Sequence, residues 1–248
     1  MIYFAIAASP SIANWLHSFV WFVLFIWFIG FNQTNQIDQP NQINLFDSSC
    51  LRYTGHRGRI IYMKAPLGKG IFLIAAPSLR DPNFRQTVVL LCEHGEEGAL
   101  GVVVNRPTAM SVSEALPQIP ILEGQRHVLF SGGPVQTNQV MMLYRLEQLP
   151  ENSHHVFDGI CLGGDTDLVD RILTATEGRE AFRAYLGYSG WGPGQLESEM
   201  QTGSWFTLPA DPNAVFHKDP TRIWPDIVSA LGEEYRHYAD MPFDPTLN

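Results

Sequence analysis

The chain has 248 residues, of which 45% are hydrophobic and 17% are charged, and its formal net charge is −9. A chain of this length can bury a sizeable core, in one large domain or two small ones. The composition excludes disordered, collagen-like and coiled-coil proteins. The acidic balance provides no basic field to collect nucleic acid. The three cysteines, Cys50, Cys92 and Cys161, are too scattered for a disulfide framework or a zinc site, so we expect reduced thiols in a reducing compartment.

The first 62 residues differ in composition from the rest. Residues 12–31 are apolar apart from Asn14, His17 and Ser18, and their number is about that of a membrane-spanning helix. Residues 32–62 follow as a polar linker that is rich in Asn and Gln at its start. We therefore separate an N-terminal extension, 1–62, from a main domain, 63–248.

The extension has two interpretations. It is either a membrane anchor, with downstream arginines that favour a cytoplasmic main domain, or upstream sequence translated from a mis-assigned start, with Met63 as the initiator. We favour the second, because no basic residue precedes Arg52, whereas a secretory leader carries Lys or Arg before its apolar run. The extension holds three arginines and two aspartates, so the main domain has 13 basic and 23 acidic side chains, a net charge of −10.

The main domain shows more strand signals than helix signals. Short apolar runs bounded by turn residues predict strands at 70–76, 87–92, 100–104, 128–130, 140–144, 182–188 and 205–208. Turn chemistry at 95–98 predicts a hairpin between the second and third runs. Between the strands, His154 and His155 are expected in a polar loop.

Four short helices are predicted, at 111–116, 165–176, 195–201 and 220–231. Ser111 and Glu114 have the spacing of a capping box, and Pro225 limits where the last helix can begin. Because the helices do not alternate with strands in a regular βαβ rhythm and hairpin signals dominate, we predict an α+β fold.

The order of the motifs resembles the YqgE/AlgH family of bacterial proteins over about residues 67–231. The blocks that carry the resemblance are FLIAAP at 72–77, DPNFR at 81–85, Glu93–His94, GALG at 98–101, NRP at 105–107, GGPV at 132–135 and GYSGWGPGQLE at 187–197, followed by Glu199 and Trp205. The resemblance implies a mostly antiparallel sheet, curled into a partial barrel with peripheral helices. It also implies a chain that begins near Met63, and members are commonly labelled transcriptional regulators on genetic association. It implies no catalytic residue, cofactor or substrate.

Glu93 and His94 follow a buried strand at a turn, where a general base or a metal ligand could lie. Adjacent residues of a strand point to opposite faces of the sheet. We therefore favour separate structural roles for these two side chains over a joint catalytic role.

Asn105 and Arg106 end the third strand. The guanidinium of Arg106 can hold a carboxylate or a phosphate with two hydrogen bonds, as an anion clamp. We favour an internal pair with an acidic neighbour such as Asp81 or Glu93, and a strand-ending role for Asn105.

The glycine-rich block at 187–197 is the least ordinary part of the sequence. Gly190, Gly192 and Gly194 permit positive φ and close approach of the backbone. Main-chain N–H groups at the start of the following helix could receive an anion, although Gln195 stands where a Walker loop has its lysine. The other interpretation, which we favour, is a tight strand-to-helix corner that buries Trp191.

These observations predict a cytosolic binding or regulatory protein that acts through protein contacts or a small anionic ligand. Any transcriptional role would be indirect, without direct DNA binding, and we expect no cofactor, no metal and no membrane contact unless 12–31 inserts. The alternative is a hydrolase or acyl-transfer enzyme in which His94, Glu93 and Arg106 converge near the Trp191 loop. The candidate ligand or partner site comprises Asp81, Glu93, His94, Asn105, Arg106, Gly190, Trp191, Gly192, Gly194, Gln195 and Glu197.

Overall fold

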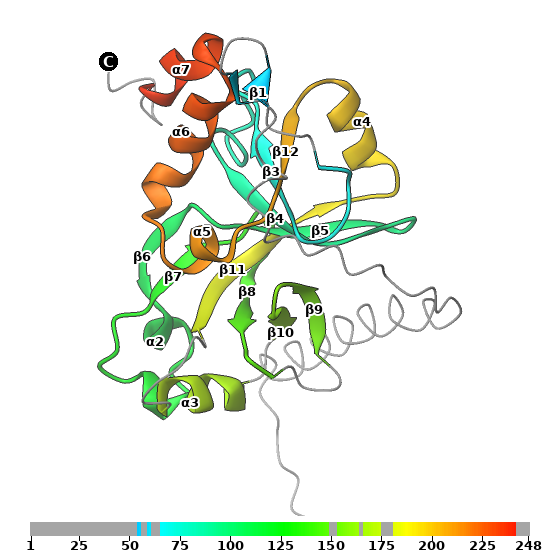
Figure 1. The fold of residues 1–248 in the computed structure, drawn as a ribbon. Helices are drawn as coiled ribbons and strands as arrows, with labels where there is room; N and C mark the ends of the chain where they lie inside the picture. The colour runs from blue at the N-terminus through cyan, green and yellow to red at the C-terminus, as the bar shows by residue number, and fades with distance from the viewer. Residues whose placement is uncertain are drawn as a thin grey trace, which may run out of the picture. The chain divides into compact units, whose positions relative to one another are not determined.

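The protein is described by a computed structural model (Figure 1). The residues that it describes are 54–55, 59–60, 65–148, 153–163, 166–174 and 181–241. All of them belong to the second of two units, Ser48–Asn248. The apolar run 12–31 and Met63, on which the two interpretations of the extension depend, lie outside the described residues.

Two short strands lie within the expected linker. β1 (Thr54–Gly55) and β2 (Arg59–Ile60) pair with each other in antiparallel orientation. Among the helices of the described residues, none is long and apolar enough to cross a membrane.

A ten-stranded sheet forms the centre of the main domain. Its strands are β3 (Ile71–Ala75), β4 (Val88–Gly95), β5 (Gly98–Val103), β6 (Pro107–Ser111), β7 (Val128–Ser131), β8 (Val135–Arg145), β9 (His154–Phe157), β10 (Ile160–Gly163), β11 (Ala181–Trp191) and β12 (Trp205–Pro209). Their order is β12-β3-β4-β5-β11-β8-β10-β9, and β7 pairs with both β11 and β6. The β7–β11 pair is parallel, while the other described pairs are antiparallel.

The α+β class and the mostly antiparallel sheet are therefore confirmed. The sheet is open rather than a closed barrel, because β12 and β9 stand at the two ends of its strand order. The expected hairpin is formed by β4 and β5, with Gly95 opposite Gly98.

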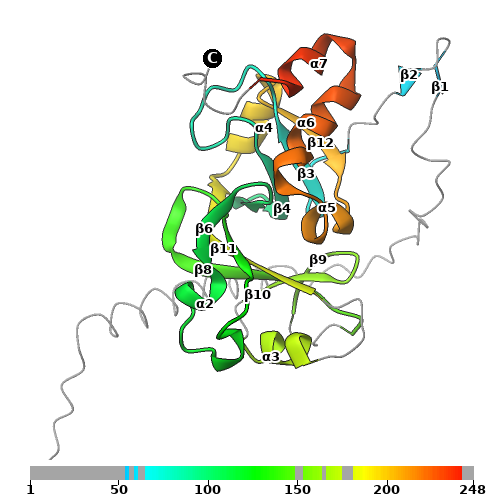
Figure 2. The same cartoon turned by 90° about the vertical axis from the view of Figure 1, so that its left-hand side faces the viewer.

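The helices lie at both ends of the sheet. Around β3 and β12 are α4 (Gln195–Gln201), α6 (Pro220–Leu231) and α7 (Glu233–Ala239), whereas α2 (Val112–Ala115) and α3 (Thr166–Thr174) lie beyond β7, β8 and β10 (Figures 1 and 2). Between the two groups, α5 (Pro212–Phe216) lies beside β11. The short 3-10 helix Pro120–Leu122 follows α2.

Strand β11 joins the two halves of the sheet. Residues 181–188 pair with β8, and Ser189–Trp191 pair with β5. At the crossing, the backbones come too close for side chains: a Cβ on Gly133 would lie 2.3 Å from the carbonyl of Tyr188, and Gly187 has a φ of +69°. The GGPV and GYSG blocks of the sequence thus meet where the sheet changes partners.

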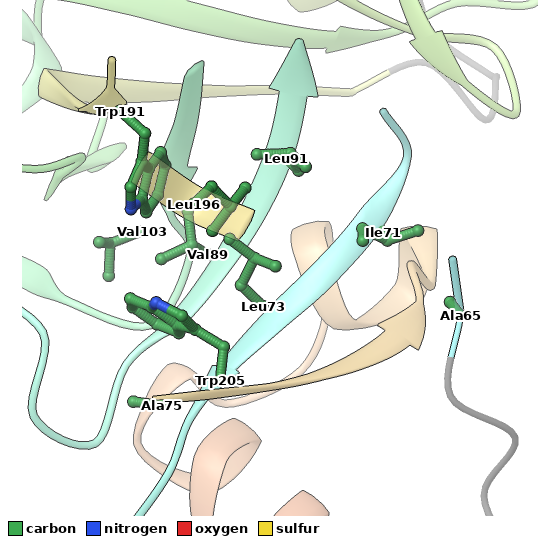
Figure 3. Close-up of a cluster of buried hydrophobic side chains, with 10 residues drawn as sticks. All are labelled: Ala65, Ile71, Leu73, Ala75, Val89, Leu91, Val103, Trp191, Leu196 and Trp205. Carbon is green, nitrogen blue, oxygen red and sulfur yellow. The ribbon is translucent and has the colours of Figure 1, made fainter. Parts of the chain in front are cut away.

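Each half of the sheet has its own core. The first core contains Ala65, Ile71, Leu73, Ala75, Val89, Leu91, Val103, Trp191, Leu196 and Trp205 (Figure 3). The second contains Val112, Ile119, Leu122, Leu129, Met142, Tyr144, Leu146, Cys161, Val169 and Ala184. Burial of such side chains is worth about 1.5–3 kcal/mol each, so both clusters stabilise the fold substantially.

The local signals of the sequence predicted several elements well. The capping box is present: the Ser111 hydroxyl accepts from the main-chain N–H of Glu114, whose carboxylate accepts from that of Ser111. Two expectations were wrong. Pro225 lies inside α6 rather than setting its start, which Asp219 caps, and His154 belongs to strand β9 rather than to a loop.

Candidate functional site

Glu93 and His94 end strand β4 and engage different elements. Glu93 forms an ion pair with His154 of β9, whereas Nε2 of His94 lies 2.7 Å from Oε1 of Glu197 in α4. In Figure 1, α4 and β9 lie on opposite sides of the hairpin that β4 forms with β5. Because the side chains of a strand alternate between faces, each of these two residues ties β4 to a different neighbour, as expected.

The His94–Glu197 pair lies at the surface, with side-chain exposures of 18% and 44%. A hydrogen bond from its own main-chain N–H, and then the bond to His94, lower the pKa of the Glu197 carboxyl. This pair fastens the start of α4 to the end of β4.

Arg106 holds a turn rather than an external anion. Its Nη1 donates to the carbonyl of Asn83 at 2.6 Å, and its Nη2 donates to those of Pro82 and Arg85 at 3.1 and 3.0 Å. Burial and the charge of Arg85 lower the pKa of the Arg106 guanidinium, while Asp81 opposes them.

The anion-clamp hypothesis is therefore not supported by these contacts, because the guanidinium donates into the protein. Of the two expected acidic neighbours, Asp81 acts on Arg106 through its charge, whereas Glu93 pairs with His154. Asp81 also closes the turn, since its Oδ1 accepts from the main-chain N–H of Asn83 at 2.7 Å.

Asn105 fastens the start of β4. Its Oδ1 accepts from the main-chain N–H of Val88 at 2.8 Å, and its Nδ2 donates to the carbonyl of Gln86 at 2.9 Å. Gln86 has a φ of +55°, a conformation that costs energy for a residue with a side chain. The side chain of Asn105 thus makes hydrogen bonds to the main chain at the start of β4, as a neighbouring strand would.

Phe84 connects the Arg106 turn to two buried tryptophans. Its ring stacks on Trp191 with a centroid separation of 6.0 Å and meets Trp205 edge-on at 5.5 Å. The two indoles are themselves edge-on at 6.1 Å. Trp191 comes from β11 and Trp205 from β12, and their rings lie near Val89, Val103 and Leu196 in the first core (Figure 3).

Glu199 is the polar centre of this aromatic cluster. Its Oε2 accepts from Nε1 of Trp191 at 3.0 Å and from Nε1 of Trp205 at 2.8 Å. Its Oε1 accepts from Nε2 of Gln195 at 2.9 Å, and Oε1 of Gln195 accepts from the main-chain N–H of Gly192 at 3.1 Å. A continuous chain of hydrogen bonds therefore runs from the buried indoles to the turn before α4.

That turn, residues 192–195, is exposed to solvent. Gly194 caps α4 with a φ of +71°, and a Cβ placed on it would meet nothing within 4 Å. Gly190 and Gly192 do not use positive φ, which corrects that part of the expectation. The favoured interpretation of the block is confirmed: it is a strand-to-helix corner, and Trp191 is 5% exposed.

Six of the predicted site residues thus form one connected group: Asp81, Asn105, Arg106, Trp191, Gly192 and Gln195. Gly194 belongs to the same exposed turn. Gly190 lies in β11, just before the turn, and is close to the ring of Tyr188. Glu93 belongs to a different contact, and His94 with Glu197 stands at the side of α4. Two central residues, Phe84 and Glu199, were not among the predicted site residues, although both belong to the motif blocks of the sequence. The four-residue spacing of Gln195 and Glu199 on one helical face was a second signal.

Three nucleophilic side chains of the described residues, those of Ser189, Cys92 and Cys161, are buried. The hydroxyl of Ser189 donates to the carbonyl of Gly132 at 3.1 Å inside the crossing of the sheet. Burial, reinforced by the charge of Glu93, raises the pKa of the Cys92 thiol, and burial raises that of Cys161. In the described part of the chain, no three His, Cys, Asp or Glu side chains are grouped as metal ligands.

Comparison with known proteins places this chain in a family. The AlgH-like family (DUF179) matches residues 72–236, which include the whole connected group. The chain is 39% identical over 183 residues to a UPF0301 protein of Chlorobium chlorochromatii, covering 73% of this chain and 96% of the relative. It is also 39% identical to a UPF0301 protein of Streptomyces avermitilis over 189 residues, covering 72% and 94%. The chain belongs to the AlgH-like family.

Two solved structures share the fold. The solution structure of the AlgH protein from Pseudomonas aeruginosa has a TM-score of 0.58 and 31% identity, and covers 73% of this chain and 98% of that one. A crystal structure from Corynebacterium diphtheriae has a TM-score of 0.58 at 24% identity, covering 72% and 94%, and so shows the fold alone. The names of these relatives state no reaction.

Proposed function

We propose that the chain is a non-catalytic binding module of the cytoplasm, which acts through contacts with a protein partner or a small anionic ligand. Its recognition element is the exposed turn 192–195. The observation that carries this proposal is the chain of hydrogen bonds from Gly192 through Gln195 and Glu199 to the buried indoles. A surface that is held in place before binding loses less conformational entropy when a partner docks.

The contacts of the predicted catalytic residues support a binding role over catalysis. His94 is paired with Glu197, Glu93 with His154, and Arg106 with the turn 82–85. A catalytic set has to converge on one reacting atom, and these three side chains engage three different partners.

The charge and the cysteines support the remaining parts of the proposal. The main domain has a net charge of −10, which opposes direct DNA binding, so any effect on transcription would pass through another protein. Cys92 and Cys161 are free thiols in the folded protein, as is usual in the reducing cytoplasm.

The proposal is tested by site-specific photo-crosslinking in the native cells. A crosslinking amino acid replaces exposed Pro193, and the control places it at exposed Gln125 near the other end of the sheet. We expect one protein to be captured repeatedly from position 193 and not from position 125. Gln195→Ala, which releases the main chain of Gly192, should reduce this capture at least tenfold. Equal capture at both positions, or capture unaffected by Gln195→Ala, would contradict a recognition role for the turn.

One observation favours the enzyme as a second candidate. The 2.7 Å His94–Glu197 pair has the geometry of a base held by a carboxylate, and it is partly exposed. A panel of ester and thioester substrates tests it, with His94→Gln as the variant. Turnover that His94→Gln abolishes while the fold is kept would establish the hydrolase or acyl-transfer alternative.

A further inference from the structure

Arg183 and Tyr185 occupy a second polar position on β11, away from the exposed turn. They are two residues apart, so their side chains leave the strand on the same face. The Cζ atom of Arg183 lies 4.3 Å from the ring centre of Phe130 in β7, and its Nη2 donates to the carbonyl of Phe216, the last residue of α5, at 3.2 Å. Tyr185 is fully buried beside the same Phe130 ring.

Two buried polar atoms of this pair lack a hydrogen-bond partner. Nη1 of Arg183 and Oη of Tyr185 are both shielded from solvent, and neither is bonded within the part of the chain that the structure describes. The groups are nevertheless close: burial raises the pKa of the Tyr185 hydroxyl, and the charge of Arg183 opposes that rise. A hydrogen-bonding contribution between the two side chains also acts on both pKa values, so they face each other, although neither atom has a partner with good hydrogen-bond geometry. One acceptor between them would satisfy both groups.

The charge of Arg183 also has no acidic partner among the described residues. Burial lowers the pKa of the Arg183 guanidinium, and the charge of Tyr185 and a hydrogen bond with it oppose that change. Three other basic residues of the domain are paired with acidic side chains: Lys218 and Arg222 with Asp226, and Arg145 with Asp158. A largely buried cation without a counter-ion is costly in a protein interior. A bound anion beside Arg183 would offset this cost.

We propose that Arg183 and Tyr185 bind the oxyanion of a small ligand, a carboxylate or a phosphate, at the junction of β11, β7 and α5. This site lies apart from the turn 192–195, so the proposal goes beyond the proposed function. A guanidinium presents parallel N–H donors to an oxyanion, and the tyrosine hydroxyl adds one more. Phe130 and the carbonyl of Phe216 hold the guanidinium in place for this contact.

The test measures anion binding to the whole protein at constant ionic strength. Sodium acetate and inorganic phosphate are titrated separately against sodium chloride, and the side-chain resonances of ¹⁵N-labelled arginine report on Arg183. We expect one saturable shift, with acetate and phosphate in separate arms that show which oxyanion is preferred. Tyr185→Phe should weaken binding about tenfold, as expected for one hydrogen bond, and Arg183→Gln should abolish it.

The controls separate a binding site from a structural contact. Arg222→Gln, at an exposed ion pair, and Tyr235→Phe, whose ring packs on Phe206, should leave the dissociation constant unchanged. If Arg183→Gln does not fold, Tyr185→Phe decides the question alone. No saturation with either anion, or equal dissociation constants for the wild type and Tyr185→Phe, overturns the proposal. Crosslinking at Pro193 does not depend on this result, so a failed anion site leaves the protein-contact arm standing.

Discussion

Two polar clusters lie against aromatic rings near the two ends of strand β11, and they differ in how completely they are bonded. Near its end, the carboxylate of Glu199 accepts from both indoles and from Gln195. Near its start, Arg183 and Tyr185 leave two shielded polar atoms without a partner among the described residues. Since buried polar groups are normally bonded, the first cluster is complete as it stands and the second gains by adding an acceptor.

The two clusters have different roles: one fixes a corner of the fold, and the other is available to bind a ligand. The completed cluster fixes the corner between β11 and α4, so the exposed turn 192–195 keeps one shape. The incomplete cluster retains hydrogen-bonding capacity for a ligand. Gly187, where β11 exchanges partners, separates the two. Each difference can be tested by changing one side chain.

The largest effect is expected at the completed cluster. Glu199→Ala removes the acceptor of two buried indole N–H groups, each of which then carries the penalty of an unsatisfied donor. We expect a loss of about 3 kcal/mol in the free energy of unfolding. Urea titration followed by tryptophan fluorescence measures it, because both indoles report on this cluster.

Two variants control for this result. Glu199→Gln keeps a side-chain oxygen that can accept, so its loss should be about 1 kcal/mol, and Glu123→Ala, at an exposed position, should change stability by less than about 0.5 kcal/mol. If Glu199→Ala were as stable as Glu123→Ala, the indoles would not depend on this carboxylate. The Glu199 cluster would then not be a stabilising, fully bonded cluster.

Sequence patterns predicted the parts of the fold that depend on neighbouring residues. The capping box at Ser111, the hairpin through 95–98 and the turn from β11 into α4 each arise within a few residues, so propensity and turn chemistry identify them. Strand β9 was missed, because His154 and His155 read as polar residues while their pairing with β10 is tertiary.

The polar contacts of the site could not be predicted in the same way. The acceptors of Arg106 are main-chain carbonyls more than twenty positions earlier, and a carbonyl has no sequence signature. Glu199 belongs to the motif blocks, but its bond to the second indole could not be predicted, because it depends on β12 bringing Trp205 beside it. Arg183 and Tyr185 alternate within an ordinary strand pattern, and only burial distinguishes them.

A second loss of stability is expected at Arg106. Arg106→Gln removes the charged guanidinium that donates to the carbonyls of Pro82, Asn83 and Arg85, and so loosens the turn that positions Phe84. We expect a decrease of about 2 kcal/mol in the free energy of unfolding, because hydrogen bonds to a charged group contribute about 1.5–3 kcal/mol.

Differential scanning calorimetry measures this change, with Arg222→Gln as the exposed control. A shift in the near-ultraviolet circular dichroism of the tryptophans should accompany it, since Phe84 stacks on Trp191. Loss of stability without any spectral change would show that the turn does not support the aromatic cluster.

A smaller effect is expected from pH at the His94–Glu197 pair. The folded-state pKa of Glu197 is lowered from its ordinary value of 4.5, so its contribution to stability is present above that pH and is lost as the pH falls through the lowered pKa. Because the carboxylate is 44% exposed, the contribution should remain below about 1 kcal/mol.

Chemical unfolding at a series of acidic pH values compares the wild type with two variants. Glu197→Gln should remove this part of the pH dependence, and His94→Gln only a fraction of it, because the main-chain hydrogen bond to Glu197 stays. An acid limb identical in all three proteins would mean that the pair contributes nothing to the anchoring of α4.

The smallest effect on stability is expected at the incomplete cluster, and it has the opposite direction. Tyr185→Phe removes a buried hydroxyl that has no partner among the described residues while the ring keeps its place beside Phe130. Without a bound oxyanion we expect stability to be unchanged or to rise by up to about 1 kcal/mol, since removing an unsatisfied group relieves its desolvation penalty. Urea titration in chloride buffer measures this, and repeating it with acetate or phosphate should reverse the sign, because the bound anion stabilises the wild type more. A loss above about 1 kcal/mol in chloride would show that the hydroxyl is already bonded, and β11 would then carry two completed clusters.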